Sequence, residues 1–320
     1  MSWFIFALIA TLGWGCADLF YKKGTDENDS HSHLKIAVWV GLVMGVCAIV
    51  LLPFAETKFS ISLLITNAAK YSPASLAYIV SMVIGYAGLR YLELSIVSPV
   101  QNASGALSTV AMLVFFTVTG SITSFTEEFA TLDIIATALI VLGVVALAIV
   151  EQRLSKEETI KENKKYRISA LALLFPILYC VFDTVGTAAD GIILNEETGL
   201  GLGEIDVIIL YGLTFLLAGL VAWIYMLIKT KKPYNPFTAT EVKTKGVAAL
   251  CEEFGQVFYV YAMAARPMLA APMIGSYCIV SVILSRIFLK EKLRASQYAC
   301  VISVIVGIVM LGISEGLAEM

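Results

Sequence analysis

Two neighbouring glutamates stand out inside an apolar stretch of the sequence. Glu252 and Glu253 lie two or three residues from the middle of segment 246–264, which is about as long as a membrane-crossing helix. A carboxylate near the centre of a bilayer costs about 2.5–3.5 kcal/mol on insertion scales, so such a residue normally faces a cavity or a partner. Two interpretations stay open: a proton-coupling or cation-binding carboxylate, or a structural pair buried between helices.

Glu252 shares one helix face with two further polar side chains. Gln256 and Tyr259 follow it at i+4 and i+7, which places all three on one side of an α-helix. Glu253 points about 100° away, although Gln256 remains within its i+3 reach. We therefore expect a stripe that binds substrate or protons, with Glu252 as the cavity acid and Glu253 as the second candidate.

Two aspartates lie closer to the ends of their apolar segments. Asp18 and Asp183 are each about 8–10 Å from the middle of a segment at 1.5 Å per residue. They suit a gate or a cavity mouth. The alternative is hydration near the membrane surface, where a carboxylate costs less than at the centre.

The remaining site candidates are polar or aromatic. Aromatic rings can hold an organic cation, or they can pack and anchor helices at the interface. Polar groups beside Pro99 and Pro272 can line a cavity or hydrogen-bond between helices. The candidates are Trp14, Asn102, Tyr179, Ser276 and Tyr277.

The chain that must position these groups is unusually apolar. Of 320 residues, 59% are hydrophobic and 15% are charged, against roughly 45–50% and about 25% in soluble domains. This composition excludes a disordered chain, a nucleic-acid binder and an ordinary cytosolic enzyme, and it predicts an all-α integral membrane protein. No CxxC pair occurs, and His31 and His33 share an acidic loop. We therefore expect no disulfide framework, metal or cofactor.

Ten apolar segments predict ten transmembrane helices, because lipid offers no partner to backbone N–H and C=O groups. The connections are short. Two of the longer ones, 152–167 and 229–245, are charged, and 152–167 is a predicted cytoplasmic linker. The segments run at about 2–21, 35–54, 73–92, 96–118, 131–150, 168–189, 205–228, 246–264, 269–289 and 295–314.

The basic residues predict the orientation. Numbering the loops by the helices they join, the loops after odd-numbered helices hold 19 of the 22 Lys and Arg, and the others hold 3. Basic loops stay in the cytoplasm. Both termini are therefore expected outside the plasma membrane.

The two halves of the chain resemble each other. At an offset of 165, Trp14 and Asp18 meet Tyr179 and Asp183. Five helices are an odd number, so the second copy enters the membrane from the opposite side, as in many secondary transporters. The predicted parts are residues 1–151 and 168–320, joined by 152–167. Further matches, at offsets of 173 and 164, are Tyr86 with Tyr259, Pro99 with Pro272, Ser108 with Ser281, and Glu127 with Glu291.

These positions also carry a family resemblance. The sequence resembles the EamA-like branch of the drug/metabolite transporter superfamily over essentially its whole length. The motifs that carry the resemblance are Trp14-Gly15 with Lys22, Ser98-Pro99, Ala271-Pro272, and Phe288-Leu-Lys-Glu-Lys-Leu followed by Gln297 and Gly307.

The resemblance implies two EamA-like repeats of five helices and a central cavity lined by helices 1, 3, 4, 6, 8 and 9. It also implies export or uptake of small metabolites. The sequence departs from the family at Lys290, where glycine is usual, and at Glu127-Glu128 after a Ser/Thr-rich loop.

The sequence is compatible with three functional classes. An inverted repeat with acids near the midplane favours a secondary transporter over a membrane scaffold or receptor. An intramembrane enzyme is disfavoured because both histidines lie in a loop. Intramembrane acids favour a small amine, amino-acid-like or drug-like substrate, coupled to protons or another ion or moved by exchange. Gly41-x-x-x-Gly45 permits close packing, either internally or in a homodimer.

Overall fold

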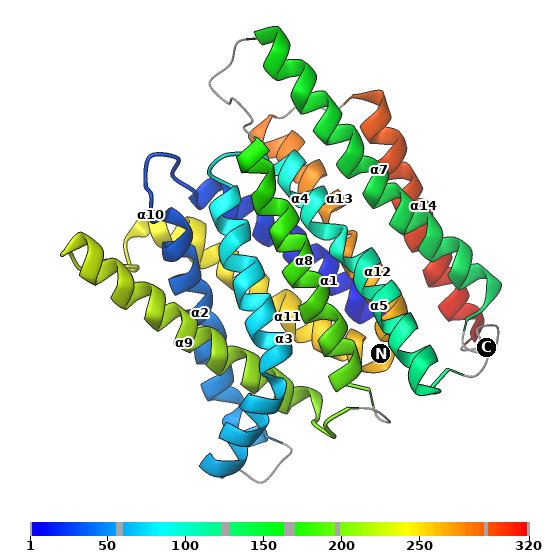
Figure 1. Ribbon diagram of the computed structural model, residues 1–320, viewed down its shortest axis with the longest axis horizontal. Coiled ribbons are helices and arrows are strands. Elements are labelled where there is room, and N and C mark those ends of the chain that lie inside the picture. The colour runs from blue at the N-terminus through cyan, green and yellow to red at the C-terminus, as the bar shows by residue number, and fades with distance from the viewer. Residues whose placement is uncertain are drawn as a thin grey trace.

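The computed structural model describes residues 2–55, 60–122, 129–162, 170–195, 199–290 and 294–318. Over these residues the chain is all helical, with no strand among them. The long helices lie alongside one another in a single bundle (Figure 1). Glu127, Glu128 and Glu291, which the sequence analysis singled out, lie outside the described residues.

The helices of the first half fall in the order that the apolar segments predict, with one segment divided in two. They are α1 (Trp3–Gly24), α2 (Ser32–Leu51), the short helix η1 (Leu52–Phe54), α3 (Ile61–Gly88), α4 (Leu94–Asn102), α5 (Ser104–Thr119) and α7 (Thr131–Glu162).

The second half repeats this order, with its own divided helix and two short π-helical turns. Its elements are α8 (Ala170–Ile193), α9 (Glu204–Thr230), α10 (Ala239–Glu241), η2 (Val242–Gly246), α11 (Val247–Ala265), α12 (Pro267–Gly275), α13 (Tyr277–Leu284), η3 (Ser285–Leu289) and α14 (Ala295–Ala318).

Eight described stretches are long and apolar enough to cross a membrane, so the chain is a multi-pass membrane protein. The predicted segments 73–92 and 246–264 are not among the eight. They correspond to α3 and α11, and α11 carries Glu252 and Glu253. The eight are Trp3–Gly24, Ser32–Phe54, Leu94–Thr119, Thr131–Val150, Leu174–Ile193, Glu204–Thr230, Pro267–Leu289 and Ala295–Ala318.

Two predicted segments are broken near their middles. Segment 96–118 divides into α4 and α5 at Ala103, and segment 269–289 divides into α12 and α13 at Ser276. Each break follows a proline by four residues, Pro99 or Pro272. Proline lacks a backbone N–H and clashes with the turn that precedes it, so it does not by itself explain a break that follows it.

The helices pack in pairs across the two halves. The main pairs are α2 with α9, α1 with α11, α3 with α8 and α7 with α14, followed by α5 with α12, α1 with α13, α5 with α8, and α4 with α13. In α2, a Cβ added to Gly41 would meet the Phe215 carbonyl and lie 3.0 Å from Cα of Gly219, and one at Gly45 would lie 2.7 Å from Leu216. The glycine motif of α2 is therefore used for packing against α9 within one chain.

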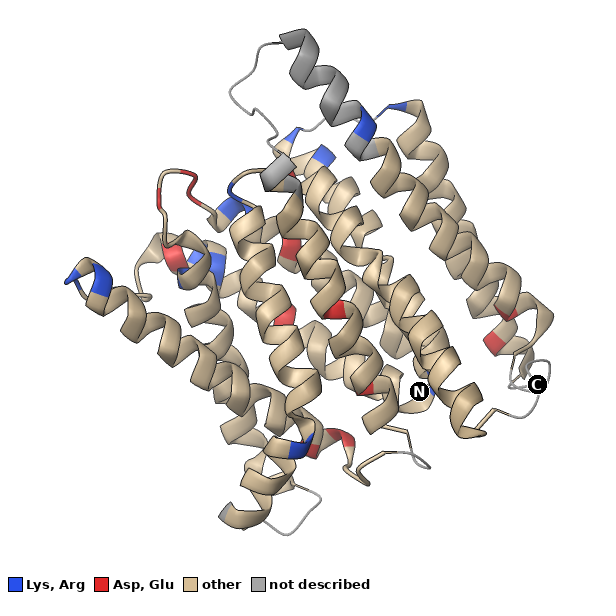
Figure 2. Ribbon diagram, viewed as in Figure 1, with Lys and Arg blue, Asp and Glu red and all other residues tan. Residues whose placement is uncertain are grey.

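Among the residues that the structure describes, most lysines and arginines lie at one end of the bundle (Figure 2), which we call the basic end (residues 22–35, 86–93 and 229–245). The described part of the predicted linker, 152–162, is not a loop but the continuation of α7. Its run of Lys, Glu, Gln and Arg consists of good helix formers, which accounts for the extension.

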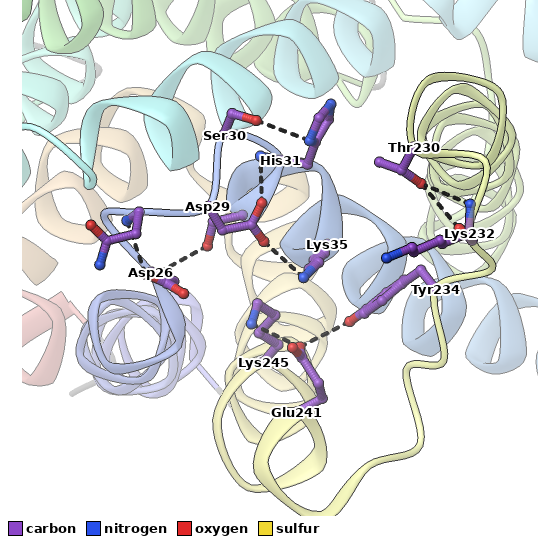
Figure 3. Close-up of polar contacts among 12 residues, drawn as sticks. Asp26, Asp29, Ser30, His31, Lys35, Thr230, Lys232, Tyr234, Glu241 and Lys245 are labelled. Atoms are coloured by element: carbon purple, nitrogen blue, oxygen red, sulfur yellow. Dashed lines mark hydrogen bonds and ion pairs between the residues drawn. The ribbon is translucent and has the colours of Figure 1, made fainter.

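Polar contacts order the loops of the basic end (Figure 3). Lys35 pairs with Asp29 at 2.7 Å, and Glu241 holds both Lys245, at 2.7 Å, and the Tyr234 hydroxyl, at 2.9 Å. Burial raises the pKa of Asp29, but the Lys35 ammonium and a backbone N–H two residues further on outweigh it and hold that pKa below its usual value. Asp29 is therefore ionised at neutral pH.

Lys290 occupies a backbone conformation that suits glycine. Its φ is +61° at the end of η3, in the left-handed region that costs a non-glycine residue roughly 1 kcal/mol. We expect Lys290→Gly to raise the free energy of unfolding by about 1 kcal/mol, measured by thermal unfolding in detergent. Lys232→Gly, where φ is not positive, is the matched control. Equal destabilisation by both changes would contradict this explanation.

Candidate functional site

A small cavity lies where several of the predicted site residues meet. Its volume is about 20 Å³, enough for one or two water molecules. It is lined from α1, α3, α4, α8, α11 and α13, which occupy the positions of helices 1, 3, 4, 6, 8 and 9. The lining residues are Trp14, Asp18, Tyr21, Tyr78, Met82, Gly85, Tyr86, Leu89, Gln101, Tyr179, Glu252 and Tyr277.

Glu252 joins three helices at this cavity. Its side chain is buried, with 3% of the residue exposed. One carboxylate oxygen accepts a hydrogen bond from the Tyr78 hydroxyl at 2.7 Å and the other from the Tyr21 hydroxyl at 3.4 Å. Tyr86 donates in turn to the Tyr21 oxygen at 3.3 Å. Hydroxyl groups both donate and accept, so they can serve either protonation state of the carboxyl group.

The two aspartates bind serines on the broken helices. Asp18 Oδ2 accepts hydrogen bonds from Ser98 at 2.6 Å and Ser281 at 2.7 Å, from α4 and α13. Asp183 Oδ2 accepts one from Ser104, the first residue of α5, at 2.6 Å. Asp18 is half-buried and lines the cavity, whereas Asp183 is buried outside its lining. Asp18 therefore connects α1 to α4 and α13, and Asp183 connects α8 to α5.

Glu253 and Gln256 lie away from the cavity lining. Glu253 is 8% exposed and faces α2, where its side chain meets the Cys47 thiol. Gln256 is 1% exposed, and neither atom of its amide has a hydrogen-bond partner among the described residues. Buried amides are normally satisfied, which makes the surroundings of Gln256 a place for water or a ligand.

Aromatic rings surround the Glu252 backbone. The Trp14 ring centre lies 5.0 Å from that of Tyr259, 5.7 Å from Tyr277 and 6.2 Å from Tyr78. Its indole N–H donates to the Glu252 carbonyl at 3.2 Å. Of the predicted residues, the structure thus brings Trp14, Tyr277 and Glu252 together, and Tyr179 joins them in the cavity lining.

Asn102 and Ser276 hydrogen-bond within their own helices, and Asn102 also hydrogen-bonds the side chain of Tyr277 on α13. Asn102 Nδ2 donates to the Ser98 carbonyl at 2.8 Å, and Ser276 Oγ donates to the Met273 carbonyl at 2.5 Å. Neither lines the cavity. Gln101, the neighbour of Asn102, does so instead. Helical spacing alone does not reveal which polar group turns back to the backbone beside a break.

Asp190 is not among the site residues predicted from the sequence. This residue is 2% exposed and accepts hydrogen bonds from the hydroxyls of Tyr71, Tyr211 and Tyr259, the last at 2.8 Å. The predicted segment ended at residue 189, but α8 continues to Ile193. The available signal was the apolar run at residues 192–194, which follows the aspartate and shows that the helix does not end there.

Comparisons with known proteins agree with this architecture. The model of the EamA-like transporter family matches residues 198–313. A solved crystal structure aligns with 100% of this chain and 99% of its own, at a TM-score of 0.62 and 11% identity, which shows a shared fold. No curated protein matches. The expected resemblance is thereby confirmed in the second half, where residues 198–313 are similar to the EamA-like transporter family.

Proposed function

We propose that this protein is a secondary active transporter that moves a small amine-bearing metabolite across the plasma membrane by alternating access. Transport is coupled to protons through Glu252, or proceeds by exchange. The observation that carries the proposal is a buried carboxylate, Glu252, whose side chain lines an aromatic cavity at the centre of the bundle.

Ten crossings fit this proposal better than eight. The two helices outside the apolar set, α3 and α11, are 28 and 19 residues long, and they pack lengthwise against α8 and α1. Both contribute cavity-lining residues, Tyr78 and Glu252 among them. A helix that presents polar groups to a cavity inside a bundle has a lower mean hydropathy and can still cross the bilayer.

The pairing of the helices supports two inverted repeats. Under an exchange of the two halves, the pair of α1 with α11 becomes the pair of α8 with α3, and α2 with α9 and α7 with α14 each map onto themselves. The breaks at Ala103 and Ser276 are 173 residues apart, the offset that aligns Tyr86 with Tyr259. Repeats of five helices are inverted in the membrane, which provides two related conformations that open to opposite sides.

The cavity lining suits a cation. Two carboxylates, Glu252 and Asp18, and several aromatic rings line it, and no lysine or arginine is among the described lining residues. The ammonium of Lys22 is held by the Leu89 and Leu92 carbonyls, at 2.6 and 2.8 Å. An amine can pair with a carboxylate and lie against the ring faces, so we propose an amine, amino-acid-like or drug-like solute.

The proposed orientation follows from the charges. Because basic loops stay in the cytoplasm, the basic end faces inward, and both termini, which lie at the other end of the bundle, face outward (Figures 1 and 2).

A ligand screen by thermal unfolding tests the substrate class. A ligand at 100 times its Kd stabilises the folded protein by about 2.7 kcal/mol, so small amines should raise the unfolding temperature and dicarboxylates at equal concentration should not. Asp18→Asn should weaken this shift, while Asp26→Asn in the exposed loop should keep it. The proposed substrate class would be wrong if dicarboxylates stabilised the protein, or if none of the amines did.

A further inference from the structure

Asp190 is a buried carboxylate that the Glu252 cavity does not use. Three tyrosines from three different helices surround it: Tyr71 of α3 donates to Oδ1, while Tyr211 of α9 and Tyr259 of α11 donate to Oδ2. Asp190 itself belongs to α8. One carboxylate thus fastens three helices to a fourth.

The cluster lies at the end of the bundle opposite the basic end. Asp190 is three residues from the last residue of α8, Ile193, and Tyr211 is seven residues after the first residue of α9, Glu204. These two helix ends are joined by the loop around residues 199–203. In the proposed orientation, Asp190 is therefore nearer the outside than Glu252 is.

Proton binding at this carboxylate competes with the three hydrogen bonds that the tyrosines donate to it. An ionised carboxylate only accepts, so it can receive all three hydroxyl protons. A protonated carboxyl group has its own O–H donor and fewer acceptor sites. The three tyrosines use three of the roughly four lone-pair sites of the carboxylate, so a proton can bind the remaining site on Oδ1. Hydrogen bonds to a neutral carboxyl group are weaker than those to a carboxylate, so protonation weakens the attachment of the three helices to α8.

The elements packed against Asp190 carry other titratable and charged groups. In general, a nearby carboxylate favours the protonated form of an acid and a nearby guanidinium favours its ionised form. Arg266 precedes Pro267, which lies against Gly191, the residue after Asp190. The groups are Tyr71 on α3, Asp206 and Tyr211 on α9, Tyr259 on α11, Arg266 at the start of α12, and Asp183 on α8 itself.

A polar path connects this cluster with Glu252. Tyr259, Gln256 and Glu252 share one face of α11. Glu252 and Tyr259 are seven positions apart, which corresponds to about 10 Å along the helix. The amide of Gln256, halfway along, has no partner among the described residues. On the other side, the rings of Tyr211 and Tyr78 lie 5.8 Å apart, and Tyr78 donates to Glu252.

We propose that Asp190 is a second proton-binding site, on the outer side of the Glu252 cavity. In its ionised form it holds α3, α9 and α11 against α8 and closes the outer end. When a hydronium ion from outside transfers its proton to an Asp190 oxygen and leaves as water, the hydrogen bonds from the tyrosine hydroxyls weaken and the outer end loosens. The assignment of this end to the outside rests on the proposed function.

Infrared difference spectroscopy tests proton binding directly. The full-length protein in lipid is titrated with acid, and the carbonyl stretch of protonated carboxyl groups is followed. We expect one titrating band of the wild type to vanish in Asp190→Asn and to persist in Glu252→Gln and in Asp26→Asn. Tyr211→Phe keeps the carboxyl group and removes one donor to its ionised form, so proton binding should tighten about tenfold.

Hydrogen exchange tests the mechanical consequence. Acidification should lower the protection factors of residues 186–193 and 204–212 in the wild type, whereas Asp190→Asn should show low protection at every pH. Three results would each overturn the proposal. The first is that Asp190→Asn leaves every titrating band unchanged, and the second is that Tyr211→Phe titrates like the wild type. The third is that protection still depends on pH in Asp190→Asn. Neither method needs a substrate, so a failed transport assay leaves the result intact and counts only against the proposed function.

Discussion

Replacing Glu252 by glutamine is expected to abolish accumulation of the solute against its gradient while exchange continues. The amide keeps the shape of the side chain and its contacts with Tyr78 and Tyr21, but it cannot carry a proton. A difference of one pH unit is worth about 1.4 kcal/mol, enough for tenfold accumulation at one proton per solute. In proteoliposomes with this gradient, the wild type should approach tenfold and Glu252→Gln should show none.

The neighbouring glutamate provides the matched control. Glu253 faces α2 and Cys47 rather than the cavity, so Glu253→Gln should retain gradient-driven accumulation. Counterflow of labelled solute, with no pH difference, shows that each variant is folded and binds. Undiminished uphill accumulation by Glu252→Gln would remove the coupling role from this residue.

Gly41→Ala is expected to destabilise the protein by about 2–3 kcal/mol, because the new methyl group would meet the Phe215 carbonyl and overpacking at a backbone atom forces the helices apart. Gly316→Ala is the control, since a Cβ there meets nothing within 4 Å and alanine favours a helix by up to about 1 kcal/mol. Unfolding in detergent and cross-linking in membranes are measured together.

These two measurements separate internal packing from assembly. Lower stability with unchanged cross-linking fits the α2 and α9 contact. If Gly41→Ala left stability unchanged and abolished a cross-linked dimer, the motif would instead form an interface between two copies of the chain.

The apolar runs were enough to predict where the long helices lie, because the requirement for internal backbone hydrogen bonds applies to every residue in lipid. The spacing of Glu252 and Glu253 also favoured Glu252 as the acid that faces a cavity. Both predictions rest on local periodicity, which a sequence displays directly.

Features that depend on neighbouring helices could not be predicted in the same way. Asn102 and Ser276 each donate to a backbone carbonyl beside a helix break, and the sequence does not show where a helix will break. Asp190 lies one residue beyond the predicted segment 168–189, and three tyrosine hydroxyls from distant parts of the sequence stabilise its burial within the helix.

The same limit explains the count of crossings. Within the described residues, hydropathy alone recognises eight spans, since α3 and α11 carry several of the polar groups of the proposed site. A helix that serves the cavity most is the one that composition identifies least readily, so the proposal of ten crossings rests on packing and on the repeat.

Proton movement driven by an added amine tests the central claim most directly. Wild-type protein is reconstituted into vesicles with no initial pH difference, an amine is added outside, and the internal pH is followed with a trapped dye. Coupled transport predicts an amine-dependent pH change that saturates with concentration and is absent in Glu252→Gln vesicles. Saturable amine uptake with no accompanying pH change, or an equal pH change in Glu252→Gln, would contradict proton coupling through this cavity.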